Sequence, residues 1–499
     1  MNLQIITVWK IIKREYRLKV GGVMGKEQQS SKAAKAGIGY TIGNYCIRGI
    51  GFITVPIFSR LLSTSDFGIY NTFLAYEAVA YIFISLALNS SLKNAKYKFP
   101  KRLDEYTSSV AILPLVLLVV ILAISFPMRN ILSMAFGLDY FCIILLFLYS
   151  YCSGLVIYYR ARIGLDYEYR EYLGLSAFNA LANVAFSLLL IFTVYREERY
   201  LGRIIGGTLV QVALAIYILF RLFFKARPKV NFEYWKFGLK ISIPLIPHAL
   251  SQIVLVQFDR IMISKIIGTA EAGIYSFAYT IYSLVQITAT SLESAYSPWA
   301  FQIMHEGKKN ELIKIGTAFM LFLGGITAGV TLLSPEFIYL LGGSKYAEAY
   351  ICTVPVLVAG FFAMSYTIPV VVEYYKEKTS YISVGTALAA VLNICLNAIF
   401  IPKYGYVAAA YTTLISYIVY FTIHVIIARK LAGFHIIQIK YLISVVAIIM
   451  VSGVVALYYH DKFTVRIGTF VVMLAIGIPM LINVYGIESI KKLVSRKGE

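Results

Sequence analysis

The sequence contains few charged residues and few cysteines for its length. Asp, Glu, Lys and Arg together make up 14% of the 499 residues, whereas hydrophobic residues make up 59%. Soluble domains usually carry about 25% charged residues, so this composition excludes an ordinary soluble protein and predicts a membrane protein. The five cysteines form no CxxC motif and no Cys/His pattern with metal-ligand spacing. We therefore expect no disulfide, no redox role and no bound metal.

Two features that pumps and enzymes need are also missing from the sequence. There is no phosphate-binding loop of the GxxxxGK[ST] kind, which disfavours transport driven directly by ATP. The longest external loop that we expect, residues 334–349, holds no convincing acid–base set for catalysis. We therefore expect a protein that is not an enzyme and that uses no cofactor.

Long apolar runs fill most of the chain. A helix needs about 20 apolar residues to cross a bilayer, and this criterion predicts an all-α integral membrane protein with fourteen transmembrane helices and short connections. Residues 1–23 are instead basic and amphipathic; an interfacial helix and a start at Met24 both remain open. The expected spans are residues 38–62, 67–91, 107–127, 140–160, 173–194, 204–224, 239–266, 272–298, 313–333, 350–372, 381–401, 407–428, 441–459 and 468–486.

Positive charge is concentrated in loops on one side of the expected spans. The segments 93–102 and 225–236 are strongly basic, and loops rich in Lys and Arg face the cytoplasm. This rule places both termini in the cytoplasm. Topology and contacts with anionic lipids then explain the net charge of +21, so we expect no nucleic-acid partner.

The chain resembles itself at an offset of 205 residues. FSRLLSTSDFGIY (58–70) aligns without gaps with ISKIIGTAEAGIY (263–275), and Asn183 and Asn393 occupy similar positions late in the two copies. Each copy holds six spans and inserts in the same direction, which predicts two lobes related by a pseudo-two-fold axis along the membrane normal, with the substrate site between them. The expected segments are a basic N-terminal segment (1–37), an N-lobe (38–224), a cytoplasmic linker (225–238), a C-lobe (239–428), two further spans (441–486) and a cytoplasmic tail (487–499).

Arg48 lies in the middle of the first apolar run. A charge at the bilayer centre costs roughly 2.5–3.5 kcal/mol on insertion scales, so such residues usually face a protein interior or an aqueous cavity. Asn44 lies one turn earlier on the same helix face, and an Arg guanidinium can bind two phosphate oxygens at once. One hypothesis is a pyrophosphate site at these two residues. The alternative is a structural ion pair between Arg48 and Glu77, which lies near mid-depth of the second span.

Ionisable residues also occur in the seventh and eighth expected spans. Asp259 could bind the H⁺ or Na⁺ that drives transport, with His248 on the same helix face, and Arg260 could contact a phosphate. The alternative is an ion pair that holds the two lobes in register. Gln286 and Glu293 lie on a polar stripe of the eighth span, which could contact sugars or pack between helices.

Four segments together resemble a known family: LLSTSDFGIYN (61–71), FDRIMISKIIGTAEAGIYS (258–276), SPW (297–299) and IPKYGYVAAAYTT (401–413). The chain resembles the polysaccharide transport family of the multidrug/oligosaccharidyl-lipid/polysaccharide exporter superfamily, and within it the O-antigen and capsule flippases. Ala408 departs from the Gly that is common in the family. The resemblance implies a flippase that moves undecaprenyl-pyrophosphate-linked oligosaccharides to the outer leaflet of the bacterial cytoplasmic membrane by alternating access. It implies as partners this lipid-linked substrate, membrane lipids and other membrane proteins of polysaccharide assembly.

Three other interpretations remain open. A cation-coupled exporter of the multidrug and toxin extrusion type usually has twelve spans and an acidic cavity, so the extra spans and Arg48 count against it. A lipid II flippase of the same superfamily has the expected number of spans, but the sequence patterns fit it less well. A membrane enzyme such as an O-antigen polymerase or ligase would need a large external loop, which the sequence lacks.

Overall fold

The computed structural model describes residues 39, 43 and 49–485, and over these residues the chain is helical and contains no β-strand. Helices suit a bilayer because each one satisfies its own backbone hydrogen bonds. Twelve helical segments of the described part are long and apolar enough to cross a membrane. They are α2 (Thr64–Ser85), α4–α5 (Leu103–Val110 and Ile112–Ser125), α7 (Tyr140–Gly164), α8 (Tyr169–Thr193), α9 (Arg199–Lys225), α10–α11 (Phe232–Ser242 and Ile246–Ile266), α13 (Lys309–Leu332), α15–α16 (Ala349–Ser365 and Thr367–Tyr375), α17 (Thr379–Tyr404), α18 (Tyr406–Ala432), α19 (Ile439–Tyr458) and α20 (Phe463–Tyr485).

Two of the fourteen expected spans are not among these twelve. The first, 38–62, is described only in part, and its residues Gly49–Leu61 form a short apolar helix. The other, 272–298, lies inside α12 (Thr269–His305), a helix of 37 residues that continues past Pro298. The connections hold the remaining short helices: η1 (Leu88–Ser91), α3 (Leu92–Lys98), α6 (Arg129–Phe136), η2 (Ile243–Leu245), α14 (Ser334–Gly342) and η3 (Ser344–Tyr346).

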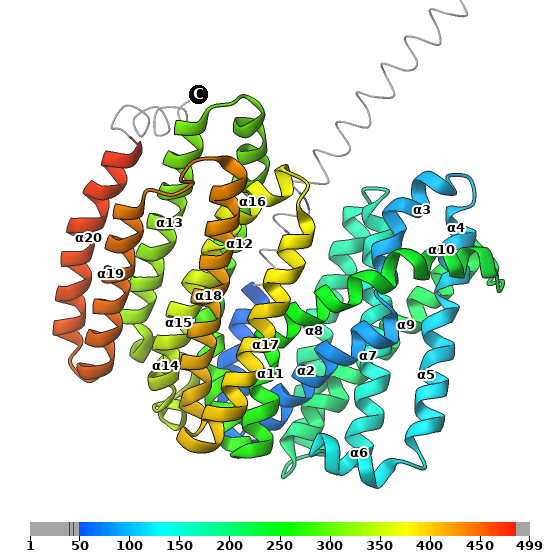
Figure 1. Cartoon of the computed structure of the whole chain (residues 1–499). Helices are drawn as coiled ribbons and strands as arrows, with labels where there is room; N and C mark the ends of the chain where they lie inside the picture. Colours follow the sequence, from blue (N-terminus) through cyan, green and yellow to red (C-terminus); the bar gives the residue numbers. More distant parts are fainter. Residues whose placement is uncertain (1–38, 40–42, 44–48, 486–499) are drawn as a thin grey trace, which may run out of the picture.

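The helices gather into two groups (Figure 1). Helices α2–α10, the N-terminal group, lie on the right of the view, and helices α11–α20, the C-terminal group, lie on the left. The groups pack on each other through α2, which contacts both α11 and α12. Helices α19 and α20 form the far edge of the C-terminal group, where both pack on α13. They therefore lie away from the contact between the groups.

The chain passes from one group to the other through α10 and α11, and a 3₁₀ turn separates these two helices. The turn spans Ile243–Leu245 and contains Pro244, and Pro247 follows in the first turn of α11. A proline lacks the N–H that would continue the helical hydrogen bonds and crowds the preceding turn. These two prolines therefore account for the break in the long segment Phe232–Ile266.

Two glycines allow α2 and α12 to come into backbone contact. A Cβ atom on Gly68 would lie 1.8 Å from the Thr269 carbonyl oxygen, and a Cβ atom on Gly273 would lie 2.0 Å from the Thr64 carbonyl oxygen. Beside them, the hydroxyls of Ser65 and Thr269 form a hydrogen bond of 2.6 Å. Gly68 and Gly273 are equivalent positions in the sequence repeat, so the contact is reciprocal. Only glycine fits at either position.

Ion pairs tie the connections to the ends of the spans. At the end of α7, Arg162 is 92% buried on its side chain; it donates to Asp104 at 2.7 Å and to Asp166, and Lys96 reaches Asp166 at 3.3 Å. At the start of α20, Arg466 contacts both carboxylate oxygens of Glu336 and is 2% exposed. The pair of Arg466 with Glu336 joins α20 to α14 of the C-terminal group.

Candidate functional site

Asp259, on α11, is a buried carboxylate at the junction of four helices of the C-terminal group. It is 1% exposed. Its Oδ2 accepts hydrogen bonds from the Tyr275 hydroxyl on α12 (2.6 Å) and the Thr413 hydroxyl on α18 (2.7 Å). Its Oδ1 accepts one from Nδ2 of Asn397 on α17, at 2.6 Å. Three donors therefore compensate the loss of water around this carboxylate, which would otherwise cost several kcal/mol.

Further buried polar groups extend this cluster along α17 and α18. The Asn393 amide donates to the Thr413 hydroxyl at 3.1 Å, and the Asn397 amide donates to Asn393 Oδ1 at 3.1 Å. The Thr412 hydroxyl donates to Asn397 Oδ1. We call Asp259, Asn393, Asn397, Thr412 and Thr413 the Asp259 cluster. It presents several oxygen atoms and one acidic group within a small buried volume.

No Lys, Arg or His nitrogen lies within 4.0 Å of the Asp259 carboxylate in the described part of the chain, and the neighbouring Arg260 acts on it only from a longer distance. None of the ion pairs there includes Asp259 or Arg260. The Arg260 guanidinium instead donates to the Val256 carbonyl at 2.9 Å and to Gln257, and it lies 4.4 Å from the centre of the Tyr279 ring. The ion pair between lobes that the sequence suggested as an alternative is therefore not seen among these residues.

The region of the N-terminal group that corresponds to the Asp259 cluster in the sequence repeat contains an arginine side chain. Arg203, on α9, donates to Asn183 Oδ1 at 2.6 Å and to the Ser187 hydroxyl at 2.9 Å. Its guanidinium lies over the rings of Phe58, at 3.7 Å, and Tyr70, at 5.0 Å. Tyr70 and Asn183 are the residues that the sequence repeat aligns with Tyr275 and Asn393. Similar surroundings thus contain an arginine in one group and an unpaired carboxylate in the other.

This arrangement gives the Asp259 cluster the chemistry of a site for a small monovalent cation. Oxygen atoms are the ligands that hard cations prefer, and a single carboxylate balances a single positive charge. A proton on the carboxylate would remove the same charge, because buried acids can neutralise themselves in this way. Either occupant would change the electrostatic cost of packing α11 against α12, α17 and α18.

The other predicted acidic and basic candidates lie apart from this cluster. Glu77 is half-buried in α2, and its Oε1 accepts a hydrogen bond from the Ser153 hydroxyl on α7. His248 lies in the first turn of α11, and its Nδ1 is buried without a hydrogen-bond partner in the described chain. Although His248 and Asp259 share a helix, the hydrogen-bond partners of Asp259 come from three other helices.

The polar stripe of the eighth expected span lies on α12. Gln286 and Glu293 are both half-buried there, and the Glu293 carboxylate is hydrogen-bonded to Thr367 at the start of α16. This contact is within the C-terminal group. Arg48 and Asn44, the predicted phosphate-binding residues, lie outside the described residues.

One buried ionisable pair was not anticipated from the sequence. Nδ1 of His424 on α18 lies 2.7 Å from Oε1 of Glu373 on α16, and both side chains are fully buried. The second carboxylate oxygen and Nε2 of the histidine have no hydrogen-bond partner in the described chain. The two residues are 51 positions apart, so no local spacing signals the pair. The sequence signal is only that each is a titratable residue in or beside an expected span: His424 lies within 407–428, and Glu373 follows 350–372.

A comparison with known protein families shows to which family the chain belongs. Residues 33–304, more than half of the sequence, match the family described as polysaccharide biosynthesis protein. The chain belongs to this family. The family resemblance drawn from the sequence is therefore confirmed, and a search of curated proteins gave no match.

Several solved transporters share the fold of this chain. A structure described as lipid II flippase MurJ in an inward closed conformation matches with a TM-score of 0.71 and 15% identity, over 89% of this chain and 98% of the other. An inward-facing multidrug resistance MATE transporter matches with a TM-score of 0.55 and 15% identity, over 77% and 98% of the two chains. A transporter from Pyrococcus furiosus matches with a TM-score of 0.52 and 14% identity, over 80% and 96%. The protein therefore has the fold of a multi-pass membrane transporter.

Proposed function

We propose that this protein is a flippase that moves undecaprenyl-pyrophosphate-linked oligosaccharides from the inner to the outer leaflet of the bacterial cytoplasmic membrane. The observation that carries the proposal is the membership of the polysaccharide biosynthesis family, supported by the fold shared with a lipid II flippase. A pyrophosphate head group cannot cross lipid unaided, because burying a bare ion costs many kcal/mol. Arg48 and Asn44 are our candidates for holding its oxygens.

Movement of two six-span lobes against each other would carry the substrate across. The reciprocal contact of Gly68 with Gly273 supports a two-fold relation between the lobes. A second reciprocal pair supports it too: Arg60 donates to the Leu340 carbonyl, and Lys265, its equivalent in the repeat, donates to the Ala135 carbonyl. The two acceptor residues, Ala135 and Leu340, are themselves 205 positions apart. With both termini in the cytoplasm, these contacts would close the outer side.

We assign the coupling role to the Asp259 cluster. A buried carboxylate that has oxygen ligands and, among the described residues, no ion pair is suited to an exchangeable H⁺ or Na⁺. The matching region of the N-terminal group would not share this role, since Arg203 already supplies a fixed positive charge there. The membrane potential also favours export, because each negative charge that leaves a negative interior gains about 2.3 kcal/mol per 100 mV.

A surface-glycan assay tests this function. Cells lacking the gene should lose surface polysaccharide and accumulate lipid-linked repeat units, and the wild-type gene should restore export. Arg48→Ala and Asp259→Asn should fail to restore it although both variants reach the membrane, whereas Glu293→Gln should retain more export than Asp259→Asn. Full export by Arg48→Ala would remove the phosphate site from the proposal.

The second candidate is a cation-coupled multidrug exporter. The shared fold of the inward-facing MATE transporter and the unpaired Asp259 carboxylate favour it. Under this alternative, loss of the gene would leave surface glycan unchanged and would raise drug sensitivity. The same deletion strain therefore separates the two candidates.

A further inference from the structure

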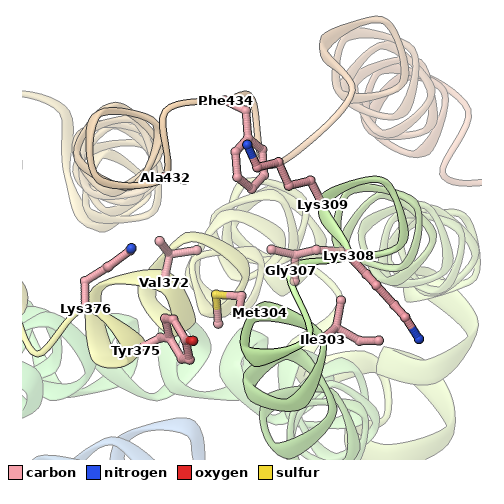
Figure 2. Close-up of a pocket in the computed structure, with 11 residues that line it drawn as sticks. Ile303, Met304, Gly307, Lys308, Lys309, Val372, Tyr375, Lys376, Ala432 and Phe434 are labelled. Atoms are coloured by element: carbon pink, nitrogen blue, oxygen red, sulfur yellow. The ribbon is translucent and has the colours of Figure 1, made fainter.

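A small pocket opens at the end of the C-terminal group where three turns meet. The α12–α13 turn, the α16–α17 turn and the segment after α18 surround a cavity of about 150 Å³. Its floor is apolar and includes Met304, Leu312 and Val372. Figure 2 shows Lys309 and Lys376 on opposite sides of this pocket, with Met304 and Val372 between them. The pocket thus combines an apolar floor with a basic rim.

The two rim lysines are not neutralised by carboxylates. No ion pair in the described part of the chain includes Lys309 or Lys376. Lys309 instead lies 5.4 Å from the centre of the Phe434 ring, which also lines the pocket. The neighbouring Lys308 points away from the other two lysines (Figure 2) and pairs with Glu306 at 2.7 Å. Two ammonium groups therefore remain available to a ligand.

The wider surroundings of the pocket are also basic. The three segments that form it, residues 305–314, 376–378 and 429–440, contain eight Lys and Arg residues and three Glu residues. The pocket also lies at the first turn of α13, which begins at Lys309, and a helix N-terminus carries a partial positive charge. An anion between the two rim lysines would be attracted by both ammonium groups and by the N-terminus of α13.

From this geometry we propose that the pocket binds the phosphoryl head group of an anionic membrane phospholipid. The rim supplies positive charge for the phosphate, and the floor supplies apolar contact for the first carbons of the lipid. The pocket lies at the ends of the membrane helices α16 and α18, where a head group would be found. The expected topology places it at the cytoplasmic leaflet, whose anionic lipids attract basic segments. This inference does not depend on what the protein transports.

Lipid binding should be measured on the detergent-purified full-length chain by native mass spectrometry, with thermal unfolding in parallel. The probes are phosphatidylglycerol and phosphatidylcholine of the same acyl composition. We expect phosphatidylglycerol to remain bound and to raise the unfolding temperature, and phosphatidylcholine to do neither. Each lost lysine should weaken binding about fivefold, so the double variant Lys309→Gln/Lys376→Gln should bind phosphatidylglycerol roughly 25-fold more weakly.

The matched control removes the same charge elsewhere. Lys225→Gln/Lys229→Gln changes two exposed lysines, one at the last residue of α9 and one in the segment after it, and should bind phosphatidylglycerol like the wild type. Equal binding by the pocket variant and the wild type would overturn the proposal, as would equal losses in both double variants, which would indicate diffuse charge. Inorganic phosphate is the third probe: if it raises the unfolding temperature as phosphatidylglycerol does, the site is one for free phosphate and the lipid assignment is wrong.

Discussion

Replacing Gly68 by alanine should force α2 and α12 apart. The new Cβ atom would lie 1.8 Å from the Thr269 carbonyl oxygen and 2.8 Å from the Gly273 nitrogen. Non-bonded heavy atoms are comfortable at about 3.5 Å, so the two helices would have to separate locally by more than 1 Å. Both close atoms belong to the backbone, and neither can move away by rotating a side chain.

The cost should resemble that of overpacking a well-packed core, about 1–3 kcal/mol. If separation of the helices relieves the clash, the same energy shifts the equilibrium away from the arrangement in which the two groups touch. Each 1.4 kcal/mol is a factor of ten in an equilibrium constant, so the touching state should become roughly 5- to 150-fold less populated. Gly68→Ala and Gly273→Ala should be less than additive, because one separation relieves both clashes.

Disulfide trapping measures this population. Ser65 and Thr269 are hydrogen-bonded through their hydroxyls at 2.6 Å, so cysteines at these two positions should crosslink readily when the native cysteines are replaced. Adding Gly68→Ala should slow the crosslinking and lower the unfolding temperature. The control is Gly174→Ala on α8, where a new Cβ atom would meet nothing within 4 Å. Crosslinking at an unchanged rate in Gly68→Ala would refute the close backbone contact.

Further substitutions test three other ion pairs. His424→Ala should lower stability by about 3–5 kcal/mol because it leaves the Glu373 carboxylate buried without its partner, and a combined His424→Phe/Glu373→Leu variant should recover part of the unfolding temperature. Arg466→Lys should cost about 1–2 kcal/mol, since Lys cannot contact both oxygens of Glu336 and that carboxylate is partly exposed; faster proteolysis between α19 and α20 would report it. Burial alone would raise the pKa of the Asp166 carboxyl. The hydrogen bonds and positive charges of Arg162 and Lys96 outweigh this effect, so the pKa lies below its ordinary value of 3.8. Its stabilising contribution is therefore complete above pH 3.8 and lost as the pH falls through the lower folded-state pKa, so Asp166→Asn should flatten the acid side of a plot of unfolding temperature against pH.

The sequence predicts those features that depend on hydrophobicity alone. Apolar runs of about 20 residues identify helices without knowledge of their neighbours, and charged residues such as Asp259 stand out within such a run. The sequence does not predict the partners of Asp259. Thr412 and Thr413 are two of many hydroxyl residues in the spans, and only the packing of α17 against α18 brings them to Asn397 and Asp259.

Helix ends were harder to predict than helix centres. The eighth span was expected to end at residue 298, yet α12 continues to His305. Pro298 lies inside this helix, where packing on α13 and α16 offsets the hydrogen bond that proline cannot make. Arg203 was missed for a related reason. It lies one residue before the expected sixth span, where a basic residue is ordinarily a topology signal, but α9 begins earlier, at Arg199, and carries Arg203 into contact with Asn183.

The corresponding regions of the two groups carry charges of opposite sign, Arg203 in one and Asp259 in the other. This difference bears on how a protein with an internal repeat can couple to an ion. The Arg203 guanidinium on α9 is permanently charged, so the packing around Arg203 does not depend on the cation concentration. The Asp259 carboxylate has no ion pair among the described residues, so its charge balance can change with what occupies the cluster. A ligand shifts a conformational equilibrium only by its different affinity for the two states. If the Asp259 cluster takes a cation, the driving ion therefore acts on the C-terminal group at a place whose counterpart in the N-terminal group holds the fixed charge of Arg203.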